Sequence, residues 1–105
     1  MIYIRGEIMM LSRKVIEPII KDVGSGWTAH WLRNEEWVRA DGKTADLAPA
    51  MAFFSDGVRL RGGDRAVVLL QPLLARQWNA KRGDAYWAYS GELKVAALEV
   101  LEVFY

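Results

Sequence analysis

Turn signals divide this sequence into short apolar segments, and that division is the strongest constraint on its fold. Turns are expected at Gly24-Ser25-Gly26, at Asp41-Gly42 and at residues 59–64. The segments between such turns have the usual length of β-strands and are too short for long helices. A chain of 105 residues can bury one core but not two. We therefore expect a single, mainly β domain over residues 1–105.

The start of the chain has two interpretations. Tyr3 to Val15 predicts an extended strand in which Gly6 marks a bulge or a bend, because glycine weakens a regular strand. Residues 15–23 also have the apolar spacing of a helix. Pro18 lies inside this run, however, and a proline there removes a backbone donor and clashes with the preceding turn. We favour a strand followed by a loop.

A β-hairpin is predicted next. Trp27 to Arg33 alternates like a strand, with both of its tryptophans on the core face. Asn34-Glu35 can turn the chain into a partner strand, Glu36 to Ala40. A longer turn would exchange some of these assignments, because one step of register flips the faces of a strand. With the shorter turn, the outer face of the hairpin carries His30, Leu32, Trp37 and Arg39.

One helix is predicted after the hairpin, over residues 46–57. Asp46 is a typical N-cap, Pro49 is tolerated in a first helical turn, and Gly57 can end the helix. The apolar residues that recur at helical spacing are Leu47, Ala50, Met51 and Phe54.

The last part of the chain predicts two strands and one ambiguous segment. Ala66 to Leu70 is apolar on both faces, which is typical of a strand buried on both sides, and Pro72 interrupts it. A basic connection, Arg76 to Arg82, leads to an alternating strand, Tyr86 to Ser90. Glu92 to Phe104 mixes residues that favour helix with residues that favour strand, and we favour the strand.

Charge is balanced over the whole chain but unevenly distributed along it. The net charge is +1, yet residues 59–82 hold six Lys or Arg and one acid, so this segment carries +5 and the remainder −4. The 5 Trp fall in strand-like stretches or basic loops. Bases stack on aromatic rings and phosphates pair with cations, so this combination indicates a surface for single-stranded nucleic acid.

The order of these elements resembles the OB-fold. The matching segments are the bent strand Tyr3-Ile4-Arg5-Gly6-Glu7-Ile8, the loop and strand Gly24-Ser25-Gly26-Trp27-Thr28-Ala29-His30-Trp31, and the strand entry Arg61-Gly62-Gly63-Asp64-Arg65-Ala66-Val67-Val68. The resemblance implies a five-stranded, OB-like Greek-key barrel with one short helix between strands three and four.

The same resemblance implies a binding site. In OB-folds the ligand commonly lies on strands two and three and on the loops after strands one and four. Carried onto this sequence, that face comprises His30, Trp37 and Arg39 on the hairpin, Lys21 before the first loop, and Arg76, Trp78, Lys81 and Arg82 in the late loop.

Each candidate residue also has a purely structural explanation. Trp37 and Trp78 are stacking platforms in one interpretation and core or core-capping residues in the other. The cations of the late loop either contact phosphates, without reading sequence, or only keep the loop solvated. His30 could stack on a base, although a plain surface residue is the simpler interpretation. A second set of cations, with alternating spacing, could form one basic edge: Arg59, Arg61 and Arg65.

Several function classes are disfavoured. The chain has no cysteine and a single histidine, which excludes disulfides, thiolate metal sites and multi-histidine sites. No nucleophile, acid/base pair or phosphate loop is recognisable, so we expect neither an enzyme nor a cofactor. The start of the chain lacks the features of a secretory signal, and no apolar run is long enough to span a membrane. We expect a soluble, cytoplasmic protein with no membrane partner.

Three functions remain as hypotheses. The first is a non-enzymatic module that binds single-stranded DNA or RNA, with DNA favoured, with little sequence preference. The second is a small protein-interaction adaptor or inhibitor of the kind encoded by viruses and mobile elements, because exposed aromatics and arginines also serve as protein hot spots. The third is self-assembly into a homo-oligomer, in which the apolar tail, residues 101–105, adds a strand to a neighbour.

Overall fold

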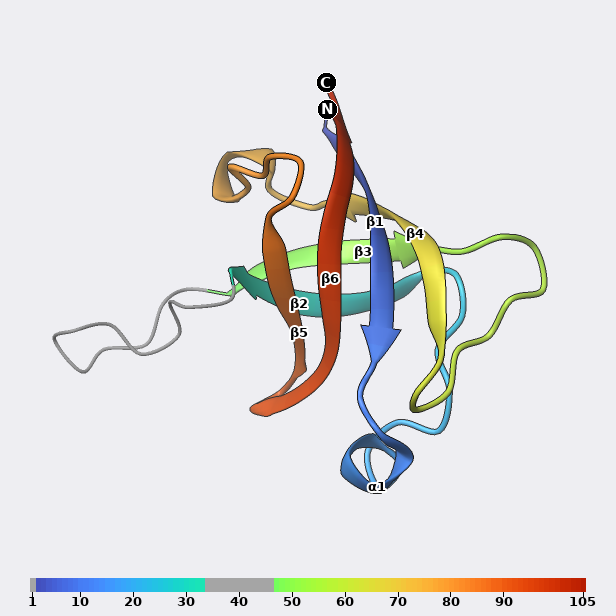
Figure 1. Cartoon of the computed structure of the whole chain (residues 1–105). Coiled ribbons are helices and arrows are strands. Elements are labelled where there is room, and N and C mark those ends of the chain that lie inside the picture. Colours follow the sequence, from blue (N-terminus) through green and yellow to red (C-terminus); the bar gives the residue numbers. More distant parts are fainter. Residues whose placement is uncertain (1, 34–46) are drawn as a thin grey trace, which may run out of the picture.

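The computed structural model describes residues 2–33 and 47–105, and its regular structure is almost entirely β-sheet (Figure 1). A short helix, α1 (Arg13–Ile16), follows the first strand, and a 3₁₀ turn, η1 (Ala75–Gln77), follows the fourth. The mainly β class predicted from the sequence is confirmed. The strands in this part of the chain are β1 (Tyr3–Met10), β2 (Trp27–Arg33), β3 (Ala48–Phe53), β4 (Arg65–Pro72), β5 (Ala85–Ser90) and β6 (Leu93–Phe104).

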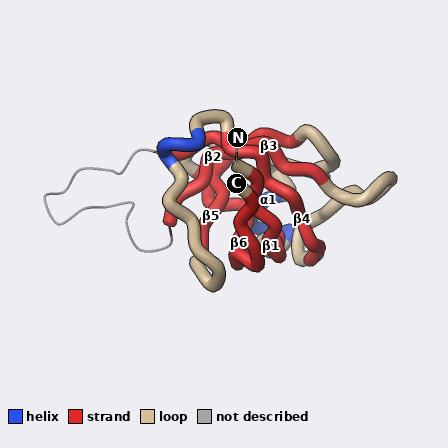
Figure 2. The backbone as a smooth tube through the Cα atoms, turned by 90° about the horizontal axis from the view of Figure 1, so that it is seen from above, coloured by secondary structure: helices blue, strands red, loops and turns tan. Residues whose placement is uncertain are grey.

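These strands form a closed antiparallel barrel. Around the barrel they follow the order β1, β4, β3, β2, β5 and β6, and β6 returns to β1. The first and last strands therefore close the structure, with Tyr3 paired to Phe104. The first described residues and the end of β6 consequently lie side by side (Figure 2).

The helix predicted over residues 46–57 is replaced by a strand. Ala48, Ala50 and Ala52 of β3 point into the barrel, while the residues between them are partly exposed. Both faces of β3 are apolar, so the sequence does not show the alternation of buried and exposed residues. The helical spacing of its apolar residues was accidental. The barrel therefore has six strands in the described ranges where five were expected, and the helix between strands three and four is not supported.

The hairpin prediction is half confirmed. Trp27 to Arg33 forms β2 with the predicted bounds, but its predicted partner, Glu36 to Ala40, lies outside the described residues. In the described structure β2 pairs with β3 and β5, so Trp31 lies opposite Ala48 and Ala88. The large ring of Trp31 is thus flanked by small side chains, which leaves room for it inside the barrel.

The first strand is shorter than predicted. It ends at Met10, and residues 13–16 form a single helical turn. The helix stops before Pro18, because proline cannot continue it. The predicted irregularity at Gly6 is confirmed, since the register between β1 and β6 shifts there. A Cβ at Gly6 would lie 2.6 Å from Leu98 Cδ1 and 2.8 Å from the Glu99 carbonyl oxygen.

The last two predicted strands are present in the structure. β5 covers the alternating segment Tyr86 to Ser90, and the ambiguous segment Glu92 to Phe104 forms the long strand β6. Near its end, Val103 pairs with Ile4 of β1. One side of the apolar tail is therefore already paired within its own chain.

Candidate binding surfaces

Trp78, one of the two predicted stacking platforms, is packed into the protein. Only 5% of its surface is exposed, and its ring centroid lies 4.9 Å from that of Tyr86. Its indole Nε1 has no hydrogen-bond partner among residues 2–33 and 47–105. The ring has no free face for a base, so the packing interpretation of Trp78 agrees with the structure and the stacking interpretation does not.

The other residues of the predicted hairpin face have mixed outcomes. Trp37 and Arg39 lie outside the described residues. His30 is exposed on the outer face of β2, as expected of a surface residue. Trp87 was not among the predicted binding residues; it lies partly exposed on β5, with the ammonium group of Lys94 at 4.0 Å from its ring centroid. This Lys–Trp contact is a cation–π pair.

Three of the predicted cations meet at the α1 end of the barrel. An isolated bridge between Val23 and Leu60 brings the loop after α1 next to the loop before β4. Lys21, Arg59 and Arg61 therefore come from distant parts of the sequence to one place. A polar pocket of about 240 Å³ opens there; its lining residues are Arg13, Glu17, Ile20, Lys21, Asp22, Arg61 and Gly62.

Within this group, the charge of Arg59 is already neutralised. Its guanidinium donates from Nε to Asp22 Oδ1 at 3.0 Å, and this bond lowers the pKa of Asp22 and raises that of Arg59. Arg61 and Lys21 lower the pKa of Asp22 further through their charge. None of the ion pairs in the described part of the chain involves Arg13, Lys21 or Arg61. These three cations therefore remain available to bind an anion.

Arg65 does not join the predicted basic edge with Arg59 and Arg61. It lies beside Glu7 of β1, with Arg65 Nη1 3.8 Å from Glu7 Oε1. Both side chains are largely exposed, so this pair contributes little to stability.

The cations of the late loop lie at the opposite end of the barrel. Figure 1 shows α1 at one end and the connection between β4 and β5, which carries Arg76, Lys81 and Arg82, near the chain termini at the other. Arg76 is exposed on η1, and Arg82 lines a second pocket beside Glu102. Among the described residues, Lys21, Arg59 and Arg61 thus lie at one end of the barrel and the late-loop cations at the other, so these two groups do not share one face.

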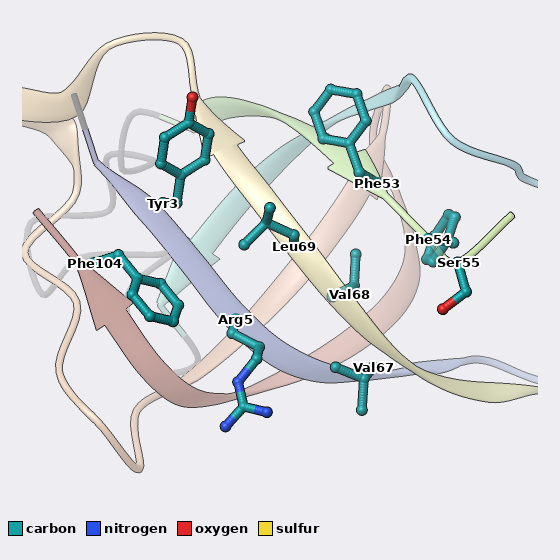
Figure 3. Close-up of a pocket in the computed structure, with 9 residues that line it drawn as sticks. All are labelled: Tyr3, Arg5, Phe53, Phe54, Ser55, Val67, Val68, Leu69 and Phe104. Atoms are coloured by element: carbon teal, nitrogen blue, oxygen red, sulfur yellow. The ribbon is translucent and has the colours of Figure 1, made fainter.

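An apolar groove on the outside of the barrel was not predicted from the sequence. It has a volume of about 610 Å³ and crosses the outside of the barrel over β1, β3, β4 and β6. Val67, Leu69 and Phe104 are 52%, 36% and 42% exposed there. Figure 3 shows the residues that line it: Tyr3, Arg5, Phe53, Phe54, Ser55, Val67, Val68, Leu69 and Phe104.

The groove arises because β4 belongs to a single-layered barrel. Val68 and Leu70 point inward and are buried, whereas Val67 and Leu69 point outward. The prediction that Ala66 to Leu70 is buried on both sides is therefore wrong. Its sequence signal, apolar residues on both faces, was real, but in a barrel only the inner face is covered by the core.

Other classes of site receive no support from the described residues. No group of three or more His, Cys, Asp or Glu suited to a metal ion occurs in ranges 2–33 and 47–105. No helix in those ranges has the length and apolar character needed to span a membrane. No family model matches the sequence, and no significantly similar curated protein is found.

Proposed function

We propose that this chain is a protein-binding module that takes up an apolar polypeptide segment in the groove outside the barrel. The observation that supports this proposal is the shared exposure of Val67, Leu69 and Phe104 in one concave surface. Contiguous exposed apolar surface is uncommon on soluble monomers and typically marks an interaction site. The aromatic rings of the groove provide the large, rigid contacts that dominate binding energy in protein interfaces.

The charge of the groove favours a partner segment that carries a carboxylate. Arg5 is the one charged residue that lines the groove in the described structure. Its Nη2 lies 3.4 Å from Glu102 Oε2, with both side chains about half exposed. Such a pair contributes about 0–1 kcal/mol, so Arg5 can exchange Glu102 for an acidic residue of the partner at little cost.

Affinity capture with matched variants tests this function. Nuclease-treated lysate is passed over the wild-type protein, over Leu69→Asp inside the groove, and over Ile19→Asp. Ile19 is 62% exposed and does not line the groove, so its variant introduces the same charge elsewhere. We expect Leu69→Asp to lose a partner that Ile19→Asp retains. Equal capture by all three proteins would contradict the proposal.

Single-stranded nucleic-acid binding is a second candidate, favoured by the convergence of Arg13, Lys21 and Arg61 on the polar pocket beside α1. Cations that contact phosphates give binding with little sequence preference and strong salt dependence. A fluorescent oligonucleotide titrated at two salt concentrations tests it. The Lys21→Ala/Arg61→Ala double variant should bind more weakly than Arg76→Ala/Arg82→Ala, which removes two cations from the other end. No binding at low salt would exclude this function.

A further inference from the structure

The first half of β4, residues 65–68, has a strand partner on one side only. The register between β3 and β4 runs from Ala50–Pro72 to Phe53–Leu69 and stops there. On the other side, β1 pairs with β4 as far as Arg65. Residues 65–68 therefore have β1 on one side and, within the described ranges, no strand on the other. This open edge lies beside Val67 and Leu69, inside the apolar groove.

The backbone groups of alternate residues point toward this open edge. The Met10 N–H donates to the Asp64 carbonyl oxygen at 2.9 Å, which makes that pair a hydrogen-bonded one. Hydrogen-bonded and non-hydrogen-bonded pairs alternate along an antiparallel ladder, so Ala66 and Val68 direct their backbone groups to β1. Val67 must then direct its N–H and C=O groups away from β1. Those two groups face the groove.

The pairing of β4 with β3 shows independently that the backbone groups of Val67 point away from β1. The Leu73 N–H donates to the Pro49 carbonyl oxygen at 3.1 Å, so Leu73 faces β3. Counting back by twos along the ladder, Leu69 also faces β3 and is paired with Phe53. Val67 is the next residue in this series, and its partner would be Ser55.

The chain turns away before Ser55 can pair with Val67. The Ser55 carbonyl oxygen accepts a hydrogen bond from the Val58 N–H at 3.0 Å, closing a turn. One residue earlier, the Phe54 N–H donates to Ser25 Oγ at 2.8 Å, which ties Phe54 to the loop before β2. The local hydrogen bonds of residues 54–58 thus keep β3 from covering the edge of β4.

We propose that an extended segment of a partner protein adds as a strand to this open edge, Arg65 to Val67. Its backbone would pair with the N–H and C=O groups of Val67, and its alternate side chains would enter the apolar groove. This inference rests on the proposed protein-binding function and specifies the conformation and chemistry of the partner segment.

A proline substitution tests the backbone contact. Val67→Pro removes the N–H at the open edge without removing a bond to β1, and edge positions tolerate proline. Val67→Thr is the matched control, because it keeps the N–H and the β-branched shape. Short random peptides displayed on phage are selected on the wild-type protein, and the enriched peptides are then synthesised. We expect apolar residues at alternate positions, binding about fivefold to tenfold weaker to Val67→Pro, and nearly unchanged binding to Val67→Thr.

Amide hydrogen exchange on the wild-type protein gives a second readout that does not depend on the folding of a variant. Exchange at the Val67 amide should slow when a selected peptide binds. Peptides that leave this exchange unchanged and bind Val67→Pro and the wild type equally, but lose Leu69→Asp, would overturn strand addition while leaving groove binding intact. Failure to enrich any peptide that distinguishes Leu69→Asp would overturn both. A dimer in light scattering that Val67→Pro dissociates would instead identify a second copy of this chain as the occupant and overturn the foreign partner.

Discussion

The two faces of β4 are equally apolar, but one is buried and the other is exposed. Val68 and Leu70 point inward and are almost fully buried, whereas Val67 and Leu69, equally apolar, point outward into the groove. The inner pair is explained by the core of the barrel. The outer pair has no such explanation within the described structure, and this difference is what points to a binding partner.

The comparison can be extended to aromatic residues, where the expected effect is largest. Trp78 is buried against Tyr86, while Phe104 lies in the groove and is 42% exposed. Trp78→Ala should destabilise the protein by about 3–5 kcal/mol, as expected for a large buried ring. Phe104→Ala should cost much less. Urea unfolding followed by circular dichroism measures both, and equal losses would show that Phe104 is a core residue.

The two leucines of β4 give a sharper version of the same comparison. Leu70→Ala should cost about 2–5 kcal/mol, because it leaves a cavity in the barrel. Leu69→Ala removes the same atoms from a partly exposed site, so its cost should be clearly smaller. If Leu69→Ala proved as destabilising as Leu70→Ala, the outer face would have to be covered within the chain, and the groove would lose its significance.

A smaller effect on stability is expected for the Asp22–Arg59 ion pair, which lies at the polar end of the barrel, away from the groove. The bond to Arg59 holds the pKa of Asp22 below its ordinary value of 3.8. The native pKa is depressed, so the stabilisation is present above the ordinary value and is lost as the pH falls below it toward the native pKa. Asp22→Asn should remove this acid-range part of the pH dependence of the unfolding free energy and leave the rest of that dependence unchanged. Unfolding curves collected from neutral to acid pH check it, and an unchanged pH profile would contradict the assignment.

The sequence predicted most strands because their local patterns are strong. Trp27 to Arg33 alternates clearly and has a glycine turn before it, and β5 alternates in the same way. The segment that became β3 failed for a specific reason: its inward positions are alanines and its outward positions include Met51 and Phe53. Because both faces are apolar, the sequence has no alternation of apolar and polar residues to indicate a strand. The accidental helical spacing therefore led to the wrong prediction of a helix.

The candidate site was harder to predict than the fold. The cations between Arg59 and Arg82 are close in sequence, but the strand β4 runs between them and carries the two groups to opposite ends of the barrel. The groove could not be inferred either, because its lining residues come from β1, β3, β4 and β6. Only the closed strand order brings those elements together. The partial signal available was the doubly apolar pattern of Ala66 to Leu70.

The most direct test of the account is a chemical-shift map of the isotope-labelled protein titrated with a peptide selected on it. We predict that the largest amide shifts fall on Val67, Leu69 and Phe104, around the groove and its open strand edge. Shifts confined to the polar end, at Lys21 and Arg61, would contradict the claim that the apolar groove is the binding surface.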